Sequence, residues 1–173
     1  MTTTVTGAAT ARAAVGPGNG QFFFIQRLMP GAHVLDVNGV SPAKGTSVIS
    51  YARNQGQNQQ WQFVPSKEFV GWWYLQTQMT TGYVMTLEDS DTVEPPQIVM
   101  QPKGVADVDR QLWCLVPTEK LGYWFIQSKR GVSNSQNPVV IGVAGNGNGA
   151  QAVGVTLNFE QFEAQAWGFS PAP

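Results

Sequence analysis

Apolar residues of this chain gather in short runs of β-branched and aromatic side chains, and Gly, Pro and Asn separate the runs. Short runs of this kind are typical of β-strands, whereas an amphipathic helix needs a longer window with a 3.6-residue period. Pro and Gly interrupt nearly every window of that length. The pattern predicts twelve strands, near 22–26, 33–37, 47–51, 61–64, 72–76, 83–87, 97–101, 113–116, 123–127, 139–143, 152–156 and 167–170.

The predicted strands fall into three similar groups of four, and each group ends with a Gln-x-Trp triplet. The triplets are Gln59-Gln60-Trp61, Gln111-Leu112-Trp113 and Gln165-Ala166-Trp167. Each group opens with an aromatic strand that ends in Ile-Gln or Leu-Gln, at 23–26, 73–76 and 124–127. Self-similarity at a fixed period indicates repeated structural units that share one core.

Three units of four strands predict a β-trefoil, an all-β fold in which six strands form a barrel and three hairpins cap it. One unit alone would leave its Trp and Ile side chains in water, so the units must pack together. We expect one domain over 21–173, with repeats at about 21–65, 71–117 and 122–171. Residues 1–20, rich in Thr, Ala and Gly, are expected to form a mobile or loosely packed N-terminal arm.

Composition fits one folded domain and disfavours nucleic acid and membranes as partners. The chain has 173 residues, of which 42% are apolar and 12% charged, with a net charge of −1. A near-neutral charge disfavours binding to nucleic acid, and no apolar run reaches the ~20 residues that membrane insertion needs. The single Cys114 excludes an internal disulfide, and the N-terminus lacks the apolar block of a signal peptide. We therefore expect a cytoplasmic or non-classically secreted protein.

Two segments of the first repeat resemble a known family. They are His33–Gly39 and Gly45–Tyr51, the second followed by Asn58-Gln59-Gln60-Trp61, and together they are similar to the ricin B-type lectin repeat. The resemblance covers roughly residues 21–171. The lack of disulfides is similar to the intracellular fungal members of this family. The resemblance implies a defence lectin or agglutinin that binds terminal galactose or N-acetylgalactosamine.

The first repeat carries a candidate sugar site in the family's positions, at Asp36, Tyr51 and Asn58. A carboxylate accepts strong hydrogen bonds from two hydroxyl groups, and an aromatic ring packs against the C–H face of a sugar. Gln59 is expected to support Asp36 from behind, while His33, Asn38 and Gly39 line the rim. Ile49 stands where the family often has Gln. The alternative is that Asp36 is a turn carboxylate and Tyr51 a core ring.

The other two repeats lack this set. Alignment places Thr86, Gln101 and Arg110 in the second repeat, and Gly142, Thr156 and Ala164 in the third, at the places of Asp36, Tyr51 and Asn58. We therefore expect one working site, with a shifted site left open, for example on the insertion at 131–137. One weak site per chain gains useful strength through assembly, so a homo-oligomer is expected.

Other motifs do not support a cofactor, a metal or catalysis. The glycine-rich segment Gly145–Gly149 lies between two strands and precedes no helix, so it indicates a turn rather than a dinucleotide site. The acidic cluster Glu88, Asp89, Asp91 and Glu94 lacks the spacing of a calcium loop. One His, one Cys and no Gly-x-Ser-x-Gly motif disfavour an enzyme.

A protease inhibitor is the alternative from a different functional class, because some β-trefoils present one long loop to a protease cleft. The candidate loops are 88–96, 103–109 and 129–138. Such an inhibitor does not need the Asp36, Tyr51 and Asn58 set, so the presence of that set favours the lectin.

Overall fold

The structure is a computed structural model and describes residues 20–28, 33–39, 43–80, 82–88, 94–105, 107–131 and 138–173. The predicted N-terminal arm falls outside these residues, apart from Gly20. So do Asp89 and Asp91 of the acidic cluster, nearly all of the insertion at 131–137, and much of two candidate inhibitor loops, 88–96 and 129–138.

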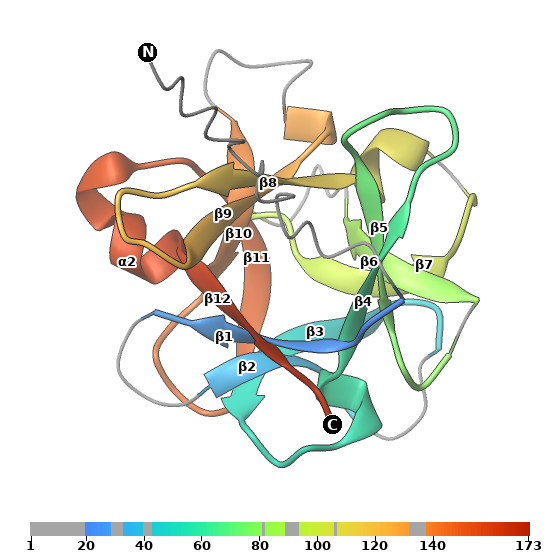
Figure 1. The fold of residues 1–173 in the computed structure, drawn as a ribbon, viewed down its shortest axis with the longest axis horizontal. Helices are drawn as coiled ribbons and strands as arrows, with labels where there is room; N and C mark the ends of the chain where they lie inside the picture. The colour runs from blue at the N-terminus through green and yellow to red at the C-terminus, as the bar shows by residue number, and fades with distance from the viewer. Residues whose placement is uncertain are drawn as a thin grey trace, which may run out of the picture.

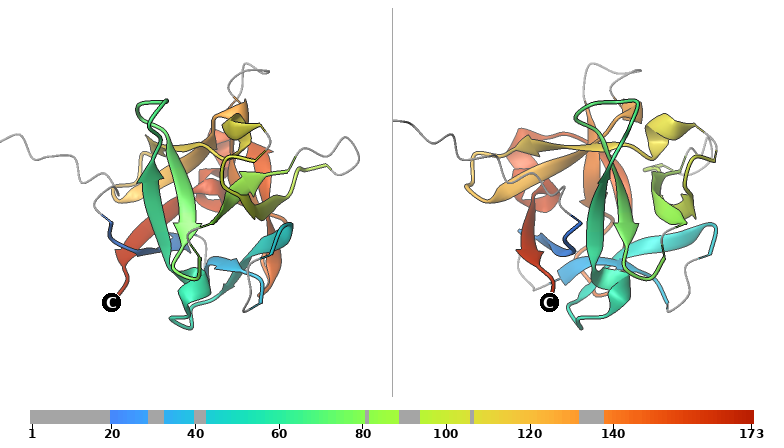
Figure 2. Two further views of the ribbon diagram at one scale, coloured as in Figure 1. Left: turned by 90° about the vertical axis from the view of Figure 1, so that its right-hand side faces the viewer. Right: turned by 45° about the vertical axis from the view of Figure 1, so that its right-hand side comes forward.

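Six strands form a closed barrel (Figure 1). They are β1 (Phe23–Arg27), β4 (Trp61–Pro65), β5 (Trp73–Thr77), β8 (Trp113–Pro117), β9 (Tyr123–Ser128) and β12 (Trp167–Pro171). Their antiparallel pairs run β1–β4–β5–β8–β9–β12 and return to β1. The views in Figure 2 show β4 and β5, drawn in green, side by side and joined by their turn.

Three hairpins cap one end of the barrel. They are formed by β2 (His33–Val37) with β3 (Thr46–Ala52), β6 (Tyr83–Leu87) with β7 (Ile98–Pro102), and β10 (Val139–Val143) with β11 (Ala150–Thr156). Strand β3 pairs with both β7 and β11, and a bridge between Gln97 and Val153 closes the triangle. Each repeat thus supplies two pairs of strands, and the β-trefoil expected from the sequence is confirmed.

The three repeats are held by the same tryptophan contacts. Trp61, Trp113 and Trp167 have no exposed surface. Their indole nitrogens donate to the carbonyls of Leu35, Met85 and Ile141, at 2.8, 3.0 and 2.9 Å. Each indole therefore fills the shared core and also satisfies a buried carbonyl of its own repeat.

One side chain breaks the threefold symmetry where the hairpins meet. Nε2 of Gln151, on β11, lies 3.0, 3.0 and 2.8 Å from the carbonyl oxygens of Val48, Ile98 and Ala152, which occupy equivalent places in the three hairpins. An amide nitrogen has two hydrogens, so three carbonyls share two donors. The side chain of one repeat thus links all three.

Short helical turns precede the closing tryptophans. They are η1 (Gln57–Gln59), η2 (Val108–Arg110), η3 (Phe159–Gln161) and α2 (Phe162–Gln165). The sequence indicated no helices here, because a single turn is too short to show a helical period. All twelve predicted strands are present, most of them with ends shifted by one or two residues.

Candidate functional site

Asp36 faces away from the core on strand β2. It pairs with Ile49 of β3, whereas its neighbours Leu35 and Val37 belong to the core cluster. Alternation of side chains along a strand causes this arrangement, since successive residues point to opposite faces. The residue is only 3% exposed, because the loop that carries η1 covers this face of the hairpin.

Two amides hold the Asp36 carboxylate. Asn58 Nδ2 donates to Oδ1 at 2.8 Å, and Gln59 Nε2 donates to Oδ2 at 2.8 Å. The hydrogen bond expected between Gln59 and Asp36 is therefore present. An ionised carboxylate offers about four acceptor positions, so the two amides leave room for further donors.

The environment of Asp36 acts on the pKa of its carboxyl in two opposite ways. Burial raises the pKa of the Asp36 carboxyl above its ordinary value, and the hydrogen bonds from Gln59 and Asn58 counter this effect in part. Burial disfavours a charge, whereas donors to the carboxylate favour it. Desolvation is the larger of the two effects at this site.

A cavity of about 340 Å³ lies beside the carboxylate. Asp36, Asn38, Gly39, Tyr51 and Asn58 contribute to its lining, with Ile49, Asn54 and Gly56. Its size lies within the range of about 300–1,000 Å³ that is typical of ligand pockets. Tyr51 is 37% exposed, so its ring is not a core ring as the alternative interpretation held.

Two other predicted site residues do not line the cavity. Gln59 is fully buried behind Asp36, where Nε2 also donates to Ala52 O at 2.9 Å and Oε1 accepts from Asn54 N. His33 lies at the start of β2, opposite Ala52, and is not among the residues that line the cavity.

Two glycines line the cavity, and the sequence pattern had not indicated Gly56. Gly39 has φ of +91° in the turn after β2, and a Cβ there would meet nothing within 4 Å. At Gly56, by contrast, a Cβ would clash with the side-chain oxygens of Asn58 and Asn54. Gly56 therefore allows Asn58 to reach Asp36. The loop spacing gave no signal for Gly56 or Asn54.

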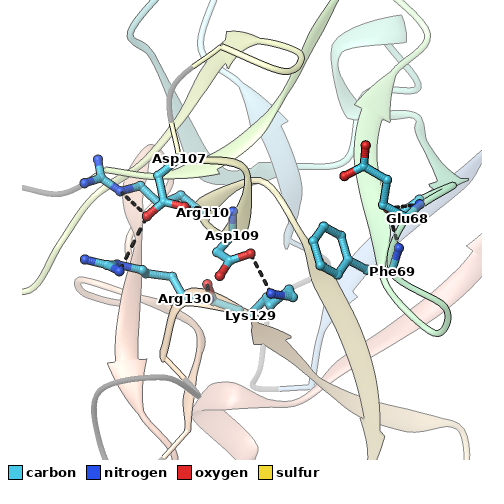
Figure 3. A network of polar contacts seen from close by, with 9 residues as sticks. Glu68, Phe69, Asp107, Asp109, Arg110, Lys129 and Arg130 are labelled. Carbon is cyan, nitrogen blue, oxygen red and sulfur yellow. Dashed lines mark hydrogen bonds and ion pairs between the residues drawn. The ribbon is translucent and has the colours of Figure 1, made fainter.

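The second repeat keeps the inner contacts of this arrangement and loses the outer ones. Gln111 Nε2 donates to Pro102 O and Gln111 Oε1 accepts from Gly104 N, as Gln59 does in the first repeat. Thr86, at the place of Asp36, donates its hydroxyl to Val84 O within its own strand. Arg110, at the place of Asn58, lies 3.8 Å from the Asp107 carboxylate (Figure 3).

The third repeat requires one correction to the alignment. Gln165 Nε2 donates to Thr156 O, as Gln59 does to Ala52 O, so Thr156 is equivalent to Ala52. The residue at the place of Tyr51 is therefore Val155, which pairs with Val140 as Tyr51 pairs with Val34. Placing Thr156 there was wrong by one residue. Gly142 stands opposite Val153, as Asp36 stands opposite Ile49.

The described residues outside the cavity include one thiol and few groups of metal-binding type. Burial raises the pKa of the Cys114 thiol to about 11, so the thiol stays protonated and unreactive near neutral pH. Among the described residues, no three His, Cys, Asp or Glu side chains gather as metal ligands would. The same residues contain no helix of sufficient length and apolar character to cross a membrane.

The chain belongs to the family described as "Ricin-type beta-trefoil lectin domain-like", which matches residues 12–102, more than half of the chain. This finding confirms the resemblance seen in the first repeat. The matched residues include all of those that line the Asp36 cavity.

The chain shows lower similarity to individual proteins than its match to the family would suggest. Flavastacin from Elizabethkingia meningoseptica is 27% identical over 117 residues, which are 62% of this chain and 26% of flavastacin. The chain thus spans about a quarter of that protein's length.

Two solved lectins share the fold. The earthworm R-type lectin C-half, in complex with GalNAc, has a TM-score of 0.62 and 17% identity, over 87% of this chain and 98% of that one. The Macrolepiota procera ricin B-like lectin, in complex with lactose, has a TM-score of 0.64 and 19% identity, over 88% and 96%.

Proposed function

We propose that the chain is a non-catalytic lectin and that the Asp36 cavity of the first repeat binds the sugar. The observation that supports this most is the pair of amides that hold Asp36 while leaving acceptor positions toward the cavity. The carboxylate would accept hydrogen bonds from two neighbouring hydroxyl groups. Tyr51, exposed at the cavity edge, would pack against the apolar face of the sugar ring.

We propose galactosides or N-acetylgalactosaminides as the ligands. The support is the family membership, together with the GalNAc and lactose carried by the two solved lectins of the same fold. Sugar binding at one open site is weak. If the Asp36 cavity is the chain's one site, useful strength comes from assembly into a homo-oligomer.

A glycan array tests the proposal, with Asp36→Ala as the variant and Thr86→Ala as its matched control. Thr86 occupies the equivalent place in the second repeat and does not line the Asp36 cavity. Asp36→Ala should lose binding, whereas Thr86→Ala should retain it, and thermal unfolding should show that both variants are folded. An unchanged array profile for a folded Asp36→Ala protein would rule out this site. Residual activity of papain or trypsin mixed with the chain separates the lectin from the inhibitor alternative.

A further inference from the structure

Asn38, in the wall of the Asp36 cavity, has a chemically reactive neighbour, because a glycine follows it in the chain. A glycine has no Cβ, so its backbone nitrogen can approach the side-chain carbonyl carbon of the preceding asparagine closely. Attack of that nitrogen on that carbon is the first step of asparagine deamidation. The other two asparagines of the cavity wall, Asn54 and Asn58, are each followed by a bulkier glutamine.

The side chain of Asn38 is not held in place. The residue is exposed, and no hydrogen bond joins its side chain to another residue that the structure describes. The two other asparagines are held, since Asn58 Nδ2 donates to Asp36 Oδ1 at 2.8 Å and Asn54 Oδ1 accepts from Gly56 N at 2.8 Å. Asn38 can therefore turn its amide toward the backbone without losing a contact.

The nitrogen of Gly39 is also available. Gly39 is exposed, and within the described part of the chain its N–H has no hydrogen-bond acceptor. A hydrogen-bonded N–H would first have to give up its partner, which costs free energy. The space beside the turn is open, because a Cβ at Gly39 would meet nothing within 4 Å. Both reacting groups of the Asn38-Gly39 pair are thus unoccupied.

The turn between β10 and β11 provides a comparison inside the same molecule. The pair Asn148-Gly149 lies there and is as exposed as the pair in the first repeat. Its two reacting groups are both occupied, however. Asn148 Oδ1 accepts from Ala52 N at 2.6 Å, and Gly149 N donates to Ser50 O at 2.8 Å. These contacts oppose the attack at Asn148.

The pair Asn146-Gly147, in the same turn, is intermediate. Asn146 Oδ1 lies 3.4 Å from Nη2 of the buried Arg27, a long hydrogen bond that restrains the side chain. Gly147 N is not among the donors of the backbone hydrogen bonds in the described turns. A fourth pair, Asn19-Gly20, begins outside the described residues. The three described pairs thus form a graded series with equal exposure.

We propose that Asn38 is a modification site, which deamidates ahead of the asparagines in the β10–β11 turn and thereby weakens the Asp36 cavity. Gly39 N forms a bond to Asn38 Cγ, and the side-chain nitrogen leaves with the proton of the glycine amide as ammonia. Water then opens the five-membered succinimide ring at either of its carbonyls. One water is consumed, one ammonia is released, and the product at position 38 is aspartate or isoaspartate.

Either product changes the cavity in the same direction. Each adds a negative charge to the wall that already holds Asp36. A nearby like charge disfavours the ionised form of Asp36, which is the form that accepts bonds from hydroxyl groups. Isoaspartate also lengthens the main chain beside Val37, whose carbonyl accepts from Asn58 Nδ2 at 3.2 Å. The loss of sugar binding, unlike the conversion itself, rests on the proposed lectin function.

The test incubates the purified chain at neutral pH and physiological temperature and follows each pair by peptide mapping with mass spectrometry. We expect conversion at Asn38 first, at Asn146 more slowly and at Asn148 last. Gly39→Asn is the matched variant, because asparagine tolerates the φ of +91° and its Cβ has room there. It should slow the conversion at Asn38 and leave the rates at Asn146 and Asn148 unchanged.

Anion exchange then separates converted from unconverted chains, and both fractions are applied to a glycan array. Chains converted at Asn38 should lose signal, whereas chains converted only at Asn146, which does not line the cavity, should keep it. If Asn38 converts no faster than Asn148, the modification site is overturned. Equal binding by the two fractions, or unfolding of the converted one, overturns the effect on the cavity. If Asn38 converts first but the unconverted chain binds no glycan, the modification site stands and the proposed function fails.

Discussion

The first and second repeats hold their closing glutamine and tryptophan in the same way, yet their outer faces differ in kind. Gln59 and Gln111 both bridge the end of a hairpin to the following loop. Beyond these glutamine contacts, the first repeat presents a carboxylate beside a cavity. The second repeat instead closes its loop with an ion pair between Asp107 and Arg110. The inner contacts carry the fold and leave the outer face free to vary.

The largest effect is expected from removal of a closing tryptophan, which is one of the inner contacts that the repeats share. Trp61→Ala and Trp113→Ala should each lower the free energy of unfolding by about 3–5 kcal/mol, because each leaves a core cavity and an unpaired carbonyl. Urea unfolding measures the loss. A much smaller loss in the second repeat than in the first would show that the repeats do not share their packing equally.

The bridging glutamines give a sharper comparison. Gln59→Ala and Gln111→Ala should each cost about 1–3 kcal/mol of stability, because buried backbone groups lose their partners. Glycan binding should weaken only for Gln59→Ala, since Gln59 alone also holds a carboxylate. If the two variants bind glycans equally well, the hydrogen bond that orients Asp36 has no role in binding.

The pH dependence distinguishes folding from binding at Asp36. Its pKa is raised by burial, so the folded state favours the protonated carboxyl, and the stability from this group is lost as pH rises through the folded pKa. Binding needs the carboxylate and should change in the opposite direction. Affinity should fall as pH is lowered, starting above the ordinary aspartate value of 3.8. Asp36→Asn should bind weakly, with a flat pH profile.

The smallest effect is expected from the ionic contacts of the second repeat. Asp107 is about one-third exposed and lies 3.5 and 3.8 Å from Arg130 and Arg110. Asp107→Asn should change the free energy of unfolding by at most about 1 kcal/mol, and less at high salt. Glycan binding should be unaffected. A large, salt-insensitive loss would mean that these contacts are part of the scaffold.

The fold could be predicted from the sequence because its signals repeat. Three tryptophans fill one core and must recur at even spacing, and each strand shows its own apolar run. The cavity wall was harder to predict. Asn54 and Gly56 lie in a loop whose path depends on the buried Gln59 amide, and loop paths leave no periodic pattern.

The register of the third repeat shows the same limit at a single position. Val155 and Thr156 are both β-branched, so the apolar pattern does not decide which of them aligns with Tyr51. The hydrogen bond from Gln165 to Thr156 O decides it, and that bond is visible only in three dimensions.

The Gln151 amide limits how the three repeats can be exchanged in protein engineering. The corresponding residues are Ser47 in the first repeat and Gln97 in the second, as the hydrogen bonds from Asn38 N, Glu88 N and Ala144 N to the three carbonyls show. A gene assembled from three copies of the first repeat would bring three short hydroxyl side chains to that axis and no amide. Circular permutation keeps all three units and should be tolerated, whereas three copies of the first unit would lose the amide that links the hairpins.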